Sequence, residues 1–221
     1  MGLSHSPSIV TSGLILCLDA ANLRSYPGSG SIWYDISGNG NNATLYNLTY
    51  SSGYLVFNGT TGYGLVSNNV SPGTGNFAVS VWFLKQEIVT NRYIWDFGSN
   101  GGTLSSGNSI TTGFRYYNPT VGSSGALYNN GPAQAINTWY NIVITRTSGV
   151  TYFYSNGALV TSQADTGSIG SWGTALTLGN YGGGGAYFHY GYYGGISVYN
   201  AGLTADQVAQ NFEALRGRYG I

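Results

Sequence analysis

Residues 77–84, FAVSVWFL, form the stretch that decides the fold class. They are rich in aromatic and β-branched side chains, which are typical of the central strands of a β-sandwich. The run WYNIVIT at residues 139–145 has the same character. Shorter apolar or alternating runs, separated by Gly, Asn, Ser and Pro, surround both. We therefore expect β-strands at residues 14–18, 43–48, 54–57, 77–84, 92–97, 139–146, 150–154, 175–178 and 195–199.

Two local motifs add detail to this pattern. Asn156-Gly157 stands between the apolar runs 150–154 and 158–161, and this dipeptide accepts the positive φ angles of a tight β-hairpin turn. Near the end of the chain, Thr204 and Gln207 have the spacing of a helix-capping box. We expect one helix at residues 204–216, with a Leu203/Val208 hydrophobic staple, an apolar face of Val208, Phe212 and Leu215, and Gly217 at its end.

The composition indicates a single domain with one substantial core. The chain has 221 residues, of which 42% are hydrophobic, and we expect an N-terminal arm at residues 1–12 followed by a β-sandwich domain at 13–221. Only 6% of the residues are charged, against roughly 25% in ordinary soluble domains. Seven basic and seven acidic residues give no net charge, so we expect neither nucleic-acid binding nor membrane insertion. Cys17, the only cysteine, lies in an apolar run and is expected to be buried.

The chemically reactive residues favour a protein without enzymatic activity. Glycoside hydrolysis needs two carboxyl groups that flank one bond, and no two of the seven acidic residues are close in sequence. The two histidines, His5 and His189, are too few for a histidine-rich metal centre. His189 is expected to be solvated or stacked on other rings.

A loop rich in oxygen ligands precedes the second apolar run. Asp35, Asn39 and Asn41, together with Asp19, could supply the oxygens of a calcium site. The alternative is that Asx-type hydrogen bonds alone hold this loop. The sequence leaves both interpretations open. Calcium is the only cofactor that the sequence suggests.

Aromatic side chains are the best candidates for contact with a glycan or a protein partner. The tract at residues 182–195 combines aromatic side chains with glycines; its rings could stack on sugars, or residues 187–193 could be a strand at the sandwich edge. The stacking candidates from the whole chain are Trp33, Trp95, Trp172, Tyr187, Tyr190 and Tyr192.

Several of these stretches together resemble one family. Residues 18–22, 25–30 and 33–45 are similar to the laminin G-like, concanavalin A-like domains of tailed-phage virion proteins, particularly cyanophage-like ones. Further markers of the resemblance are residues 57–59, 79–83, 139–143, 154–157, 178–181, 195–204 and 211–221.

The resemblance implies an all-β, two-sheet antiparallel concanavalin A-like jelly roll with a short C-terminal helix. It also implies a virion structural or adhesion protein on the particle surface, in a capsid decoration, tail or fibre. Its partners would be other virion proteins, host-surface glycans and further copies of the chain. The alternatives are a carbohydrate-binding module of a secreted protein and, third, a glycoside hydrolase. Relatives that hydrolyse β-glucans carry closely spaced acidic residues on one strand, which this sequence lacks.

Overall fold

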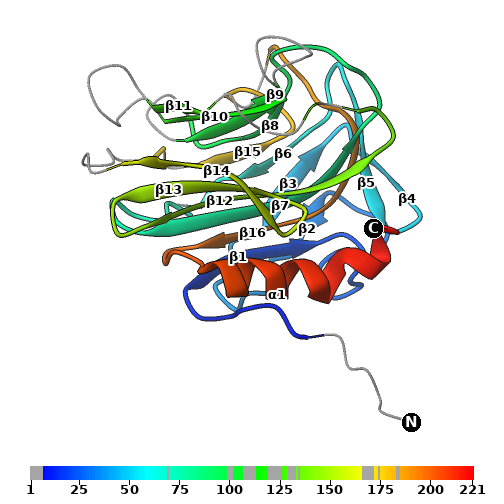
Figure 1. The fold of residues 1–221 in the computed structure, drawn as a ribbon. Helices are drawn as coiled ribbons and strands as arrows, with labels where there is room; N and C mark the ends of the chain where they lie inside the picture. Colours follow the sequence, from blue (N-terminus) through cyan, green and yellow to red (C-terminus); the bar gives the residue numbers. More distant parts are fainter. Residues whose placement is uncertain are drawn as a thin grey trace.

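Two antiparallel β-sheets of eight strands each pack face to face in the computed structural model of the chain (Figure 1). The structure describes residues 7–68, 70–98, 102–106, 113–118, 126–128, 133, 135–165, 172–173, 175–182 and 185–221. The core lies between the two sheets. This arrangement confirms the predicted all-β jelly-roll sandwich.

The first sheet carries both runs that indicated the fold class, and they are neighbours at its centre. In spatial order its strands are β14 (Ala158–Ala164), β13 (Val150–Ser155), β12 (Trp139–Thr147), β7 (Phe77–Lys85), β16 (Tyr190–Tyr199), β5 (Tyr54–Asn58) and β4 (Thr49–Ser51), and β1 (Leu14–Asp19) also pairs with β16.

The second sheet is built mainly from shorter strands. Its order is β11 (Ala126–Tyr128), β10 (Phe114–Asn118), β9 (Thr103–Ser106), β8 (Tyr93–Asp96), β15 (Leu176–Leu178), β6 (Tyr63–Val66), β3 (Ala43–Tyr46) and β2 (Ile32–Trp33). The sequence did not predict β2, β6, β9, β10 or β11, nor β4 of the first sheet. Several of these are rich in Gly, Ser or Tyr and lack an apolar alternation, such as TLSS in β9.

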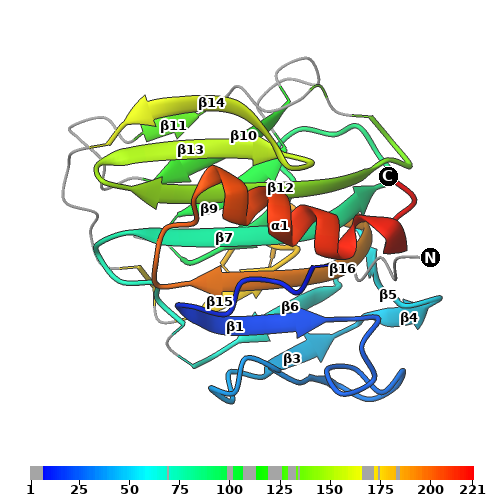
Figure 2. The ribbon, with the colours of Figure 1, turned by 60° about the horizontal axis from the view of Figure 1, so that its bottom comes forward.

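Strand β7 is buried on both faces. Phe77, Val79, Val81 and Phe83 point into the core between the sheets. The alternate side chains point outward, where the helix α1 (Ala205–Leu215) lies across the first sheet (Figure 2). Because both faces are covered, the strand reads as a continuous apolar run.

The two local motifs have the predicted structure. The side chain of Thr204 accepts from the backbone N–H of Gln207, and the Gln207 side chain accepts from the backbone of Thr204, which completes the capping box. Asn156 and Gly157 take φ angles of 49° and 78° in the turn between β13 and β14. Gly217, however, does not end the helix, because the chain continues through it as a 3₁₀ turn at Arg216–Arg218.

The glycine-rich tract forms more strand than expected. Strand β16 begins at Tyr190, five residues before the predicted start, and pairs with both β5 and β7 there. Gly191 allows this close pairing, because a side chain there would overlap the backbone of Leu84 on β7. From residue 190 onward the tract is therefore a strand, as one of the two interpretations predicted, but this strand lies between β7 and β5 inside the sheet and not at the sandwich edge.

The N-terminal segment is bound to the helix as far as the structure describes it. The backbone N–H of Val10 donates to Asn211 Oδ1 at 2.7 Å, and Gln210 Nε2 donates to the carbonyl of Ser8 at 2.7 Å. Residues 1–6 of the predicted arm lie outside the described residues. In the part of the chain that is described, no helix has the length and apolar character of a membrane span.

Candidate ligand-binding site

The three tryptophans proposed as stacking platforms lie in the core. Trp33 and Trp95 are fully buried, and Trp172 is 4% exposed. Trp172 packs edge-on against Phe77 and Phe97, with ring centroids 4.9 and 4.8 Å apart. A buried ring cannot stack on a sugar, so the prediction is wrong for these three residues.

A different set of rings surrounds an open hollow on the outer face of the first sheet. We call it the aromatic hollow. It has a volume of about 240 Å³ and is lined by Ser51, Ser52, Tyr54, Leu84, Trp139 and Tyr192. All four apolar side chains are half-buried, and both serines are exposed.

The strand register explains why these residues meet. Trp139 on β12 is opposite Leu84 on β7, and Leu84 is opposite Tyr192 on β16. Residues that are opposite each other on one face of a sheet have adjacent side chains. The Tyr54 ring lies beside this row, with its centroid 4.7 Å from that of Trp139 and 6.4 Å from that of Tyr192.

Two of the predicted tyrosines share this surface and a third does not. Tyr190 lies two residues before Tyr192 on β16, hence on the same face, and it is 39% exposed. Tyr187 packs instead against Tyr93 and Tyr181 beside β8. The sequence predictions do not include Tyr54 or Trp139. One feature of the sequence could have identified Trp139. Successive side chains of a strand point to opposite faces of the sheet. Because Tyr140 and Ile142 belong to the core, Trp139 points to the outer face.

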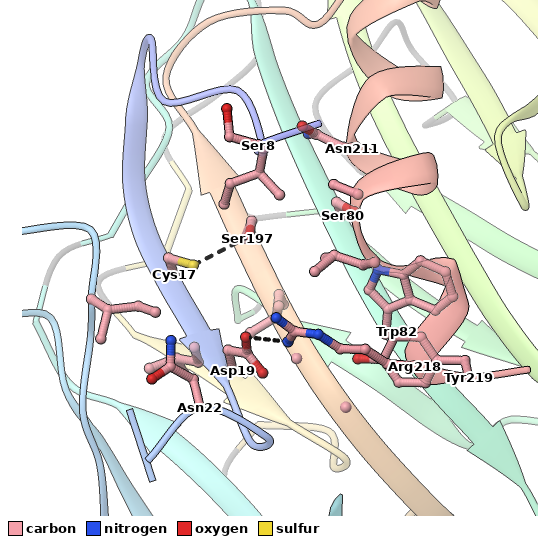
Figure 3. A pocket seen from close by; sticks show the side chains of 18 of the residues that line it. Ser8, Cys17, Asp19, Asn22, Ser80, Trp82, Ser197, Asn211, Arg218 and Tyr219 are labelled. Atoms are coloured by element: carbon pink, nitrogen blue, oxygen red, sulfur yellow. Dashed lines mark hydrogen bonds and ion pairs between the residues drawn. The ribbon is translucent and has the colours of Figure 1, made fainter. Parts of the chain in front are cut away.

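Tyr219 forms a wall between the aromatic hollow and a second, more enclosed space. Its ring stacks on Trp82 with centroids 4.1 Å apart and lies 4.6 Å from Trp139. It sits directly over Gly194, where any side chain would overlap the tyrosine ring. The second space, which we call the helix cavity, has a volume of about 260 Å³ and lies between β1, β16 and α1 (Figure 3).

Two polar pairs lie along the helix cavity. Arg218 Nη1 is 2.6 Å from Asp19 Oδ2, and Ser197 Oγ donates to Cys17 Sγ at 3.8 Å (Figure 3). Cys17 is buried, as predicted. Burial raises the pKa of its thiol to about 11, so the thiol is protonated at neutral pH.

The proposed calcium ligands have protein partners. Asp35 accepts from the backbone N–H groups of Cys17, Ser37 and Asn41 and from the Ser37 hydroxyl. The amide nitrogens of Asn39 and Asn41 donate to the carbonyls of Leu14 and Ile15.

The carboxylate of Asp19 is paired with Arg218. Among the described residues, no group of three or more His, Cys, Asp or Glu side chains could hold a metal. These contacts favour the alternative of an Asx-bonded loop, and calcium binding stays a prediction.

Most of the other carboxyl groups each have their own partner within the protein. Glu87 Oε1 is 2.7 Å from Arg92 Nε, Asp165 Oδ2 is 3.2 Å from Arg146 Nε, and Glu213 Oε2 is 2.7 Å from Arg216 Nε. Asp96 is fully buried and accepts from the backbone N–H groups of Gly98 and Gly182. Burial raises the pKa of its carboxyl group. Asp206 is exposed in the first turn of α1.

Solved structures of three other proteins share the fold at low sequence identity. A Trypanosoma rangeli sialidase in complex with sialic acid is 16% identical with a TM-score of 0.71, over 97% of this chain and 36% of the sialidase. The receptor-binding domain of a botulinum neurotoxin C/D mosaic serotype is 15% identical with a TM-score of 0.70, over 92% of this chain and 52% of that chain.

The binding domain of Paraclostridial Mosquitocidal Protein 1 is 15% identical with a TM-score of 0.69, over 90% of this chain and 52% of that chain. This chain therefore spans about a third to a half of these structures. No curated protein matches the sequence.

A family model identifies the wider group. A laminin G-type model, described as the concanavalin A-like lectin/glucanases superfamily, matches residues 58–209, which are more than half of the chain. The two-sheet architecture agrees with this match. The chain therefore belongs to the concanavalin A-like lectin/glucanases superfamily.

Proposed function

We propose that this chain is a non-enzymatic adhesion protein whose aromatic hollow binds a neutral sugar of a surface glycan. The observation that carries the proposal is the set of three half-buried rings, Tyr54, Trp139 and Tyr192, around one open hollow. Aromatic faces pack on the apolar faces of sugar rings, and a few polar groups at the rim fix the orientation. The exposed hydroxyls of Ser51 and Ser52 are such groups.

The charge of the lining determines the class of sugar. None of the described residues that line the aromatic hollow is charged. A sialic acid or a uronic acid would bring a carboxylate that needs a cation, above all an arginine. A neutral hexose or deoxyhexose needs no such partner. The similarity to a sialidase supports the fold and not this choice of ligand.

The engaged carboxylates support a role without catalysis. Glu87, Asp165, Asp19 and Glu213 each pair with a different arginine. Asp35 is bonded to its own loop, and Asp96 is enclosed by backbone N–H groups. A retaining or inverting glycosidase needs two carboxyl groups within about 5–10 Å of each other across one substrate. Residues paired in this way are poorly placed for that task.

We further propose that the chain carries out this adhesion on the surface of a tailed-phage particle. This part rests on the resemblance of the sequence to laminin G-like virion proteins. Mass spectrometry of purified particles from a phage that encodes this chain should detect it at a copy number typical of a structural protein. Particles that lack the chain would contradict the virion setting and would favour the secreted carbohydrate-binding module.

Removing a ring of the aromatic hollow should weaken glycan binding. For Trp139→Ala and for Tyr192→Ala we expect the affinity to fall about tenfold or more, because a buried stacking contact at the centre of a site is worth more than about 1 kcal/mol. The ligand would be the neutral oligosaccharide selected on a glycan array, and the affinity would be measured by titration calorimetry.

Tyr34→Ala is the matched control, because Tyr34 is 45% exposed and lies outside the hollow. Its affinity should equal that of the unmodified chain. If Trp139→Ala and Tyr192→Ala bound the oligosaccharide as tightly as Tyr34→Ala does, the glycan would bind outside the aromatic hollow. Cleavage of the bound oligosaccharide during a long incubation would instead show a hydrolase.

A further inference from the structure

The helix cavity exists because small side chains stand in one row beneath α1. Cys17 on β1 is opposite Ser197 on β16, and Ser197 is opposite Ser80 on β7. All three residues line the cavity. Large rings occupy the neighbouring rows on either side, at Trp82 and at Tyr199. The helix therefore rests on these rings and bridges the row of small residues.

The walls of the helix cavity are mainly apolar. They include Ile9 from the N-terminal segment, Ile36 from the loop after β2, Trp82, and Ala214 and Leu215 from α1. A volume of about 260 Å³ is larger than the ~150 Å³ cavity that is known to hold a six-carbon ring. By this comparison it has room for about ten non-hydrogen atoms.

Two polar atoms at the floor of the helix cavity can donate a hydrogen bond to a ligand. Ser80 Oγ accepts a hydrogen bond from Asn141 Nδ2 at 3.1 Å, so its own proton is left to donate. Cys17 Sγ accepts from Ser197 and keeps its S–H proton, because burial holds the thiol in its protonated form. A ligand with one oxygen acceptor would satisfy one of these two donors, which stand on either side of β16.

The charges of the cavity cancel each other. Asp19 and Arg218 form an ion pair at one end, with 2.6 Å between Oδ2 and Nη1. An anionic ligand would have to compete with Asp19 for the arginine, and a cationic ligand would have to compete with Arg218 for the carboxylate. The cavity therefore favours an uncharged ligand.

We propose that the helix cavity is a second binding site, which takes a small, uncharged, mainly apolar molecule with one oxygen acceptor, such as an aromatic or aliphatic alcohol. The site is distinct from the aromatic hollow, since Tyr219 separates the two. It does not depend on glycan binding, and it can be tested without any sugar.

The single cysteine reports directly on occupancy. Cys17 is the only cysteine of the chain, so a small methanethiosulfonate reagent labels one known position on the cavity floor. The reagent reacts with the thiolate, so the labelling is followed over hours at about pH 8, where a small fraction of the thiol is ionised. The probe is benzyl alcohol, and benzoate and benzylamine are analogues of similar size that carry a charge. At about ten times its Kd, benzyl alcohol should slow the labelling about tenfold, because only the empty protein reacts. The two charged analogues should leave the rate unchanged.

Two substitutions of one residue show where the probe binds. Ser197→Leu fills the cavity from its floor and should abolish the protection by benzyl alcohol. Ser197→Ala keeps the volume and should preserve the protection. If Ser197→Leu does not fold, Ala214→Leu fills the same space from the helix side. A labelling rate that benzyl alcohol does not change, or that it slows equally in the filled variant, would overturn the proposal. Equal protection by benzoate would overturn the uncharged ligand class.

Discussion

Gly191→Ala is expected to prevent the chain from reaching its native sandwich. Gly191 has a φ of 147° in β16, and a Cβ atom there would overlap the backbone carbonyl oxygen of Leu84 on β7. Both strands are central to the first sheet, so neither can move aside without breaking the pairing that holds the core. Backbone overlap together with an unfavourable φ places the cost above about 4 kcal/mol, a large share of the stability of a typical domain.

Circular dichroism and thermal unfolding of the soluble fraction would measure this effect. Two alanine variants serve as controls, because a Cβ atom at Gly182 or at Gly217 meets nothing within 4 Å. Gly182 has a φ of 64°, so Gly182→Ala isolates the cost of the backbone angle, which is about 1 kcal/mol. Gly217→Ala should be close to neutral. A Gly191→Ala protein that unfolds within a few degrees of the parent would contradict the close pairing of β16 with β7.

Acid is expected to destabilise the protein through His189. This side chain is fully buried among the rings of Phe57, Phe83 and Tyr193, and its Nε2 is 3.2 Å from the carbonyl of Leu84. Burial, and then the nearby charge of Lys85, lowers the pKa of His189 from 6.5 to about 3. The neutral ring is therefore the form that the core accepts.

The sign of the pH dependence follows from this lowered pKa. Above pH 6.5 the histidine is neutral in both the folded and the unfolded chain, and its contribution to stability is complete. As the pH falls from 6.5 towards 3, only the unfolded chain takes up the proton, so stability is lost. At about 1.4 kcal/mol per pKa unit, the loss reaches about 3 kcal/mol at about pH 4.

Urea unfolding at about pH 7.5 and at about pH 4 would measure this loss. His189→Gln has no titrating group at this position, and its amide can still donate to Leu84. We expect the unmodified chain to lose about 3 kcal/mol more between the two pH values than this variant does. Carboxyl groups such as Asp96 are present in both proteins. Their contributions cancel when the loss of stability in the variant is subtracted from the loss in the unmodified chain. The same loss in both proteins would mean that His189 is accessible to protons in the folded state.

Local chemistry accounts for the features that the sequence predicted well. The capping box of Thr204 and Gln207 and the turn at Asn156-Gly157 are determined within four residues, and both have the expected structure. The two long aromatic runs identified the centre of the first sheet, because a strand reads as a continuous apolar run when both of its faces are covered. His189 is stacked on other rings, one of the two predicted environments, and it is not solvated.

The candidate site depended on contacts that the sequence does not reveal. Trp95 was expected at the surface, yet a bulge between Tyr93 and Trp95 in the pairing with β9 lets both Ile94 and Trp95 join the core. The aromatic hollow combines Tyr54, Trp139 and Tyr192 from three strands that are far apart in sequence. Only the register across the sheet brings them together, and register is a tertiary property.

A crystal structure of the chain with its best neutral glycan tests the central claim most directly. We expect one sugar ring packed against Trp139 and Tyr192 in the aromatic hollow, with hydroxyl groups near Ser51 and Ser52. A glycan bound at another surface, such as the one formed by Tyr93, Tyr181 and Tyr187, while the aromatic hollow stays empty, would contradict the claim.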